Sequence, residues 1–162
     1  MKIFKQRGQF PDKKRRAYFK TLSNYKEGSF QNQIETPALL EGTSMIRVLW
    51  EFLRKSPNTL PEHEIPSVRT DLKKLTLEED VLIWFGHSSY FIQIDGKRFL
   101  IDPVFSGNAS PVPNSVSSFL GSNTYQVDDM PSVDVLLISH DHWDHLDYDT
   151  IQKLKGKLGK VV

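Results

Sequence analysis

The feature that most constrains this chain is an apolar run followed at once by a dense group of histidines and acids. The run over 133–139 has the length and aliphatic content of a strand buried on both faces, as in a sheet covered by helices. Open α/β sheets place their sites at the carboxyl ends of such strands, where the chain enters a helix. The residues at this point are His140-Asp141-His142-Trp143-Asp144-His145. The pattern therefore predicts an α/β fold with a site at the end of this strand.

The spacing within this group indicates metal binding. His140 and His142 alternate along an extended segment, so both imidazoles can point toward one metal ion. Asp144 and His145 follow as the chain turns into a helix, where they can reach a second ion. Zinc accepts N and O ligands, and two adjacent divalent ions can share a hydroxide and polarise a phosphoryl or carbonyl oxygen. A polar turn with solvated histidines is the structural alternative.

The composition narrows the set of ligands and excludes several classes of protein. The 162 residues contain no cysteine, which removes disulfides, thiol catalysis and cysteine-based zinc fingers. Hydrophobic residues make up 38% and charged residues 25%, which argues against a coiled coil, collagen or wholesale disorder. The net charge of +1 gives no indication of a nucleic-acid partner. Because the sequence shows neither a signal peptide nor a membrane-spanning apolar run, we expect a cytoplasmic protein.

Residues 1–75 predict a helical and irregular N-terminal arm. Its first 20 residues carry eight basic groups and one acid, a net charge of +7. A basic arm of this kind can contact an anionic membrane surface, and a solvated arm is the alternative. Residues 43–55 predict one amphipathic helix, capped by Thr43 or Ser44, whose apolar face we expect to pack into a core.

Residues 76–162 have the pattern of a β-rich domain with one helix. Short apolar runs predict strands over 81–85 and 89–94, and Asp95-Gly96 predicts a two-residue turn into a strand over 97–101. A helix is expected to start near Asp147 or Asp149 and to bury Ile151 and Leu154, and Lys160-Val161-Val162 reads as the opening of a further strand. Between Pro103 and Pro131 lies a long loop rich in Ser, Pro, Asn and Gly, which is either a binding loop or a covering loop that only packs.

The group at 140–145 resembles the HxHxDH metal-binding motif of the metallo-β-lactamase superfamily of hydrolases. The resemblance extends to the branch that contains N-acyl-phosphatidylethanolamine-hydrolysing phospholipase D and the ascorbate-phosphate lactonase-like enzymes, and it covers most of residues 25–162. The segments that agree with this branch are Tyr25–Asn32, Trp84–Ser89, Leu100–Pro103 and Ser139–Tyr148. The resemblance implies an α/β (α+β) fold, the first half of an αββα sandwich preceded by the arm.

The resemblance also implies roles for the matched residues. His140 and His142 would bind a first metal ion and Asp144 and His145 a second, with two zinc ions per complete domain and manganese or iron as alternatives. Asp144 would in addition be catalytic, by orienting the attacking water and transferring a proton. Asp102, which ends a strand beside the site, would fix the tautomer of a ligand histidine through its second ring nitrogen.

Four further residues are weighed against structural roles. His87 lies at the matching edge of the site, where it either lines the pocket or is a solvated turn residue. Trp143 and Asp147 would pack around the site or buttress it. His63 lies in a segment rich in Pro and Glu and is assigned no role.

The resemblance covers only the first half of the superfamily's domain. Its later His, bridging Asp and final His have no counterpart after His145. We favour the interpretation that the chain is a piece of a longer hydrolase, and a truncated gene product or half of an assembly are the alternatives. The implied function is a phosphodiesterase (phospholipase D-like) or lactonase-like hydrolase, with a metal-bound hydroxide as nucleophile and a small-molecule or lipid substrate. The alternative is a non-catalytic half-domain, an assembly or regulatory module that self-associates through its uncovered sheet face.

Overall fold

The computed structural model describes residues 9–34, 36–37, 39–54, 59–112 and 114–162. Contacts divide the chain into two units, Met1–Thr59 and Leu60–Val162. This division falls earlier than the boundary expected near Leu75. The reason is that Leu72 is buried in the core of the second unit and the Thr70 N–H donates to the Tyr125 hydroxyl at 2.7 Å.

The first unit contains two short helices and a two-stranded ribbon. The elements are α2 (Lys13–Phe19), β1 (Tyr25–Lys26), β2 (Ser29–Phe30) and α3 (Met45–Leu53). The ribbon turns through Glu27 and Gly28, both at positive φ, and the rings of Phe19, Tyr25 and Phe30 lie 4.9–5.6 Å apart. Among the described residues of this unit none is buried, so these rings form a local cluster rather than a core.

Helix α3 confirms the expected cap and corrects the expected packing. The Ser44 hydroxyl accepts the Arg47 N–H, and Arg47 pairs with Glu51 at 2.9 Å. However, Met45 is 67% and Leu49 59% exposed, so the expectation that the apolar face packs into a core is wrong for the described side chains. A helix cap and an ion pair act within one turn or two, whereas burial needs partners that this unit does not supply.

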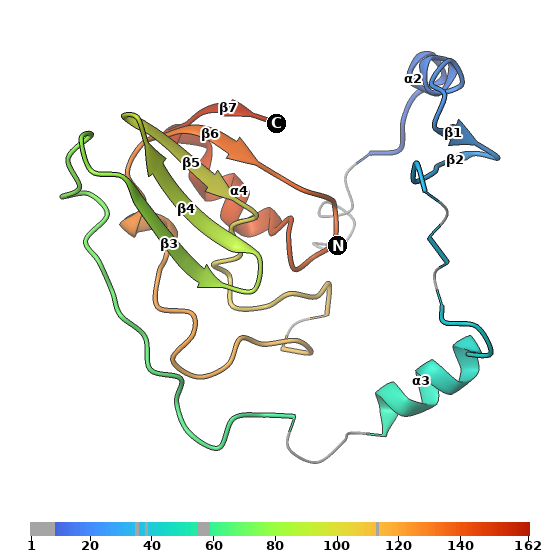
Figure 1. Ribbon diagram of the computed structural model, residues 1–162, viewed down its shortest axis with the longest axis horizontal. Helices are drawn as coiled ribbons and strands as arrows, with labels where there is room; N and C mark the ends of the chain where they lie inside the picture. Colours follow the sequence, from blue (N-terminus) through green and yellow to red (C-terminus); the bar gives the residue numbers. More distant parts are fainter. Residues whose placement is uncertain (1–8, 35, 38, 55–58, 113) are drawn as a thin grey trace. The chain divides into compact units, whose positions relative to one another are not determined.

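The second unit is built on one five-stranded sheet (Figure 1). The strands are β3 (Val81–Gly86), β4 (Ser89–Ile94), β5 (Lys97–Ile101), β6 (Val133–Leu137) and β7 (Leu158–Val161), in that spatial order. The first three are antiparallel, and β5–β6 and β6–β7 are parallel. The predicted turn is present, with φ of 48° at Asp95 and 69° at Gly96. The strand predictions are confirmed.

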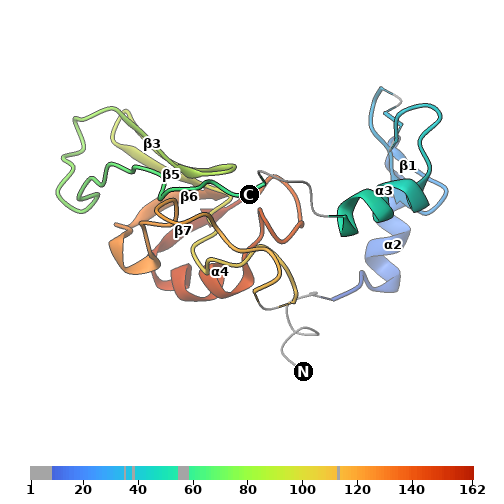
Figure 2. The ribbon, with the colours of Figure 1, turned by 90° about the horizontal axis from the view of Figure 1, so that it is seen from below.

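One face of this sheet is covered by α4 (Tyr148–Leu154), which connects β6 to β7 (Figure 2). The helix begins after Asp147, as predicted, and buries Leu154 completely. Short 3-10 helices lie at Val127–Asp129 and Lys155–Lys157. The core between helix and sheet holds ten buried apolar residues: Leu72, Phe91, Leu100, Phe105, Tyr125, Val127, Met130, Val133, Leu136 and Leu154.

The opposite face of the sheet is open within the described chain. Register aligns Leu82 and Val135 on this face, and Leu82 is 66% and Trp84 64% exposed. Strand β6 is buried at Val133 and Leu136, while Val135 and Leu137 are half-buried. The expectation that β6 is buried on both faces is corrected, because no described helix or strand covers this side. No described helix has the length and apolar character needed to cross a bilayer.

Candidate metal centre

The His and Asp group lies where β6 ends and the chain turns toward α4. A tight turn forms there, since the N–H groups of His145 and Leu146 both donate to the His142 carbonyl, at 3.0 and 2.8 Å. A second turn, between β3 and β4, presents His87 at φ 47° immediately after Gly86. Left-handed φ is uncommon for a residue with a side chain and is frequent at functional sites.

Asp102 supports the site from below the turn. It ends β5, is only 2% exposed and adopts φ 42°. The His145 Nδ1–H donates to Asp102 Oδ2 at 2.8 Å, which leaves His145 Nε2 free to face a ligand. The sequence prediction that Asp102 fixes a histidine tautomer thus has the geometry it requires.

Ser139 is a residue whose role the sequence reasoning missed. Its N–H and hydroxyl donate to the two carboxylate oxygens of Asp102, at 2.8 and 2.6 Å. Because the single hydroxyl proton is used there, the Ser139 oxygen can only accept from His140 Nδ1 at 2.9 Å. The Nε2 atom of His140 is therefore the one left for a metal ion, as in His145. In the sequence, the indication of this role is the position of the serine directly before the histidine motif.

Three donor groups converge on one point. Three ligand atoms lie within 4.8 Å of one another, one each from His87, Asp144 and His145. The His87 Nε2 and Asp144 Oδ2 atoms are 2.9 Å apart and share a proton whose place a cation can take. His145 Nε2 is 3.7 Å from the same oxygen. Two imidazoles and one carboxylate are a donor set that fits zinc and other first-row divalent ions.

The acids of the site stay ionised. Burial raises the pKa of Asp102, but the hydrogen bonds from His145 and Ser139 outweigh it, and the pKa lies below its ordinary value. Burial also raises the pKa of Asp144, but its own N–H, the electrostatic interaction with His145 and the His87 hydrogen bond outweigh it and lower that pKa too. Ionised carboxylates are the form that accepts hydrogen bonds and binds cations.

His140 and His142 lie beside this group without joining it. Their ring centroids are 4.6 Å apart, and the rings of His140 and His145 are 3.9 Å apart. The donor atoms of His140 and His142 do not share the tight grouping that His87, Asp144 and His145 make among the described residues. Their assignment as ligands of a first ion stays a prediction, and both side chains are exposed.

The remaining predicted residues surround the site in different ways. Asp147 caps α4: its carboxylate accepts N–H groups of the first helical turn, the Thr150 hydroxyl at 2.6 Å and the Ser106 N–H at 2.9 Å. It therefore buttresses the helix that follows the site. Trp143 is half-buried and, unlike His87, is absent from the lining of a cavity of about 680 Å³ beside the site. His63 is exposed.

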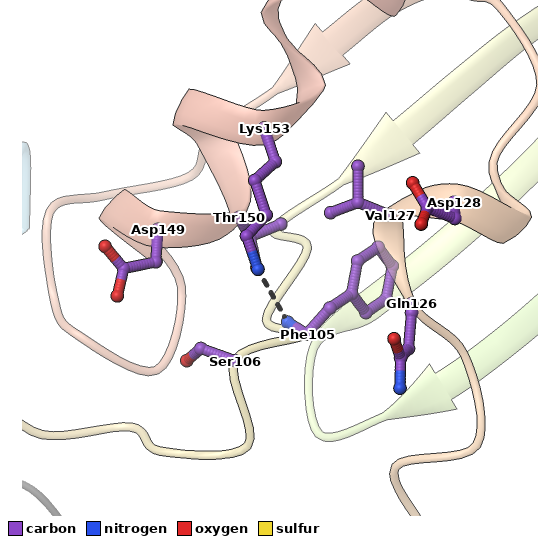
Figure 3. Close-up of a pocket in the computed structure, with 8 residues that line it drawn as sticks. All are labelled: Phe105, Ser106, Gln126, Val127, Asp128, Asp149, Thr150 and Lys153. Atoms are coloured by element: carbon purple, nitrogen blue, oxygen red, sulfur yellow. Dashed lines mark hydrogen bonds between the residues drawn. The ribbon is translucent and has the colours of Figure 1, made fainter.

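A cavity of about 160 Å³ lies beside α4 (Figure 3). Its wall includes the Phe105 N–H, which donates to the Thr150 hydroxyl at 3.0 Å. The residues that line it are Phe105, Ser106, Gln126, Val127, Asp128, Asp149, Thr150 and Lys153. None of the predicted site residues is among them.

Known proteins share this part of the sequence. Residues 81–160 match the family model described as the beta-lactamase superfamily domain. An uncharacterised protein of Mycobacterium tuberculosis (strain ATCC 25618 / H37Rv) is 33% identical over 142 residues, which are 87% of this chain and 38% of that protein. N-acyl-phosphatidylethanolamine-hydrolyzing phospholipase D 1 of Caenorhabditis elegans is 34% identical over 76 residues, 44% of this chain and 20% of the relative. The chain thus spans well under half the length of these relatives.

Two further matches carry metal chemistry in their names. A UPF0173 metal-dependent hydrolase of Caldivirga maquilingensis is 40% identical over 65 residues, 40% of this chain and 23% of the relative. The crystal structure of CmlA, a diiron beta-hydroxylase from Streptomyces venezuelae, is 36% identical and covers 53% of this chain and 15% of that one. Its TM-score of 0.39 is too low for an argument from structural likeness.

The fold and the family match agree with each other. A mixed sheet with a helix on one face and an open opposite face is the half-sandwich that the motif resemblance implied. The matched segment runs from the first residue of β3 into β7 and contains every residue of the candidate metal group. Residues 81–160 of this chain therefore belong to the metallo-β-lactamase superfamily.

Proposed function

We propose that the protein is a metal-dependent hydrolase that cleaves a phosphodiester or an ester or lactone bond. The observation that carries the proposal is the convergence of His87, Asp144 and His145 within 4.8 Å, with His145 oriented by a buried carboxylate. A divalent cation bound there would lower the pKa of a water molecule and polarise the oxygen of the bond to be cleaved.

The residues of the chain divide the work between holding the cation and handling protons. Asp102 keeps the proton of His145 on Nδ1, so that Nε2 is the metal-binding nitrogen. Asp144 has one oxygen near both histidines and an ionised carboxylate, which suits it to bind the cation and to accept a proton from water. His140 and His142, which are exposed in the turn after β6, are proposed as ligands of the other ion.

The names of the relatives support a hydrolytic reaction without fixing the bond. One is named as a hydrolysing phospholipase D, which favours a phosphodiester, and two are named metal-dependent hydrolases. Another relative, from Streptomyces venezuelae, is named as a 3-hydroxylase and is 35% identical over 86 residues. The donor set of two imidazoles and one carboxylate places zinc first as the cofactor, with iron and manganese as the alternatives.

Metal analysis tests the proposal. The purified chain is dialysed against Zn²⁺, then against buffer, and the bound metal is measured by mass spectrometry alongside the Asp144→Ala and His145→Ala variants. We expect about one tightly bound ion per chain and its loss in both variants. His63→Ala is the matched control, because His63 is exposed and outside the group. Metal content that is far below one per chain, or that Asp144→Ala leaves unchanged, contradicts the proposal.

The class of bond is tested separately. Bis(4-nitrophenyl) phosphate reports phosphodiester cleavage, and 4-nitrophenyl acetate and γ-butyrolactone report attack on a carbonyl. We expect Zn²⁺-dependent turnover of one class, removed by chelation and by Asp144→Ala. Because the chain covers only part of its relatives, the assay is run on the chain and on the longest protein that contains it.

The open sheet face favours a second candidate, an assembly module. Leu82, Trp84 and Ile94 are 66%, 64% and 48% exposed on one face, which is more apolar surface than an isolated domain usually leaves in water. A second copy of the chain could cover this face. Light scattering tests it: a dimer that Leu82→Asp disrupts supports the module, and a stable monomer at high concentration removes it.

A further inference from the structure

A cavity of about 680 Å³ adjoins the candidate metal group. It is enclosed by the segment 65–68, the turn between β3 and β4, and the loop over 104–125. His87 and Asp144, two members of the metal group, are among its lining residues. Its volume lies within the range of small-molecule sites in proteins. A ligand held at the metal group can therefore extend directly into this cavity.

The walls of the cavity are mainly apolar. The apolar side chains include Val68, Trp84, Val104, Val116, Phe119 and Tyr125. No described lining residue is a Lys or Arg, and the Tyr125 hydroxyl already accepts the Thr70 N–H at 2.7 Å. The groups able to meet a charged part of a ligand are thus His87 and Asp144, at the metal group. The remaining wall combines these apolar side chains, which suit a hydrocarbon, with uncharged polar ones such as Asn108, Ser117 and Thr124.

One part of the cavity wall is formed by aromatic side chains that pack against one another. Tyr125 is buried and packs its ring 4.8 Å from that of Phe85, which lies 5.2 Å from the ring of Phe105. Such pairs hold aromatic side chains in one arrangement. The cavity is therefore backed by a packed aromatic cluster, whereas Val116 and Phe119, which also line it, are 48% and 44% exposed.

The loop that closes the cavity is tied down at its tip. The Ile65 N–H donates to the Leu120 carbonyl at 2.9 Å, and the Ser67 hydroxyl to the Gly121 carbonyl at 2.6 Å. Gly121 has φ +82°, and a Cβ there would lie 2.3 Å from the Ile65 carbonyl oxygen, so the close approach requires glycine. The long loop between Pro103 and Pro131 thus does more than cover the core, because it forms one wall of a cavity beside the site.

We infer that this cavity binds the hydrocarbon tail of an amphiphilic substrate whose polar end lies at His87 and Asp144. The position of the polar end rests on the proposed function, and the apolar site rests on the cavity alone. The ligand class is a single acyl or alkyl chain attached to the group that is hydrolysed.

Dye displacement tests the inference. The probe is N-phenyl-1-naphthylamine, an uncharged dye that fluoresces in apolar surroundings, titrated into the full chain in EDTA so that no metal contributes. We expect one dye site per chain, displaced by dodecanoate and not by butyrate. Across saturated acids of intermediate length, each added pair of fully buried methylenes should tighten displacement by up to about 15-fold.

Two wall variants and two controls assign the site. Val116→Asp and Phe119→Asp should weaken dye binding by about tenfold or more, since a carboxylate in an apolar wall must lose water. Leu120→Asp is the matched control, because Leu120 neighbours Phe119, is 79% exposed and lies outside the described lining. Leu82→Asp controls for dye on the open sheet face. Circular dichroism of each variant checks that it is folded.

The outcomes separate this inference from the proposed function. Equal dye binding by Phe119→Asp and the unaltered chain, or loss of binding in Leu82→Asp alone, overturns the inference. Dye binding without tight metal binding supports the apolar site and contradicts the proposed hydrolase. Metal binding without dye binding supports the hydrolase and contradicts the apolar site. Monomeric dodecanoate and phosphatidylcholine vesicles are separate competitors. Displacement by the monomer indicates an amphiphile from solution, and displacement by vesicles alone a membrane lipid.

Discussion

Helices α3 and α4 have similar lengths and similar caps, and they differ in what covers their apolar residues. Ser44 caps α3 and Asp147 caps α4, each by accepting N–H groups of the first turn. Yet Leu49 of α3 is 59% exposed, while Leu154 of α4 is fully buried against the sheet. Local signals therefore start and stop helices in both units, but only the second unit provides a surface on which a helix can bury its apolar side.

The same contrast extends to function. In the second unit the sheet holds Asp102, Ser139 and the histidines at fixed positions, because these residues follow strand ends that hydrogen bonds lock in register. The first unit has charged and aromatic side chains of its own, but none of the described ones is buried or oriented by a buried partner. Metal binding of the kind proposed needs such preorganisation, so it is expected from the second unit alone.

The largest expected difference concerns the core. Phe91→Ala should lower the free energy of unfolding by about 3–5 kcal/mol, because Phe91 is fully buried and its removal leaves a cavity. Leu49→Ala in α3 should change it by less than about 0.5 kcal/mol, since Leu49 is mostly exposed. Urea unfolding followed by circular dichroism measures both. A comparable loss of unfolding free energy in both variants would contradict this comparison, because it would mean that Leu49 of α3 is packed against other side chains.

The next effect concerns support of the site. Asp102→Asn removes the carboxylate that accepts from Ser139 and His145, and it should weaken Zn²⁺ binding by about 10- to 100-fold. The affinity is measured by competition with a chelating dye. Asp141→Asn is the control, because Asp141 is exposed and belongs to the same loop. Equal affinities in the two variants would show that Asp102 does not orient a metal-binding histidine.

The two helix caps should respond unequally. Asp147→Ala should destabilise the second unit by about 1–2 kcal/mol, because the buried carboxylate caps α4 and also accepts the Ser106 N–H and the Thr150 hydroxyl. Asp12→Ala removes the cap of α2 in the first unit and should leave the main unfolding transition unchanged. Thermal unfolding of both variants measures the difference, and equal shifts in melting temperature would refute the division into independent units.

Low pH should destabilise the second unit. The pKa of Asp102 lies below its ordinary value of 3.8, because its hydrogen bonds from His145 and Ser139 outweigh the effect of burial. A carboxyl group with a lowered folded pKa contributes stability that is complete above about pH 4 and is lost as the pH falls through its folded pKa. The urea concentration at the midpoint of unfolding, measured between pH 6 and pH 2, should therefore decrease once the pH is below about 4. The fall should be shallower in Asp102→Asn, and an unchanged profile in that variant would contradict the assignment.

The smallest effect is expected on the surface of α3. Arg47→Ala removes the exposed pair with Glu51 and should lower helix stability by about 0.3–0.5 kcal/mol, with a smaller effect at high salt. Far-ultraviolet circular dichroism of a peptide that spans residues 43–54 measures it without interference from the sheet. A salt-independent loss would indicate that Arg47 acts through packing of its side chain instead.

Local patterns in the sequence predicted most of the second unit's elements. The strands β3 to β5, the Asp95-Gly96 turn and the start of α4 after Asp147 each depend on a few adjacent residues, and all are present. The HxHxDH motif likewise identified the segment that carries the site. Burial was predicted less well, because the exposure of α3 and of one face of β6 depends on which other parts of the chain are available to cover them.

The geometry of the site lay beyond local patterns for the same reason. His87 and Asp144 are 57 residues apart and Asp102 and His145 are 43 residues apart, and only the folded sheet brings each pair together. His87 was weighed equally as a pocket residue and as a solvated residue, and its proximity to Asp144 follows from the β3–β4 turn. Ser139 lies in a segment that resembles the family, but its two hydrogen bonds to Asp102 depend on the fold and cannot be predicted from the sequence.

The most direct test of the account is the state of individual histidine nitrogens in the metal-free and zinc-bound chain. Proton-detected NMR of histidine labelled with ¹⁵N distinguishes Nδ1 from Nε2 in each ring. The account predicts a protonated Nδ1 in His145 before zinc is added, and a large shift of the Nε2 resonances of His145 and His87 when it is added, with His63 unchanged. A Nδ1 without its proton in His145, or zinc shifts that leave both of these rings unaffected, would contradict it.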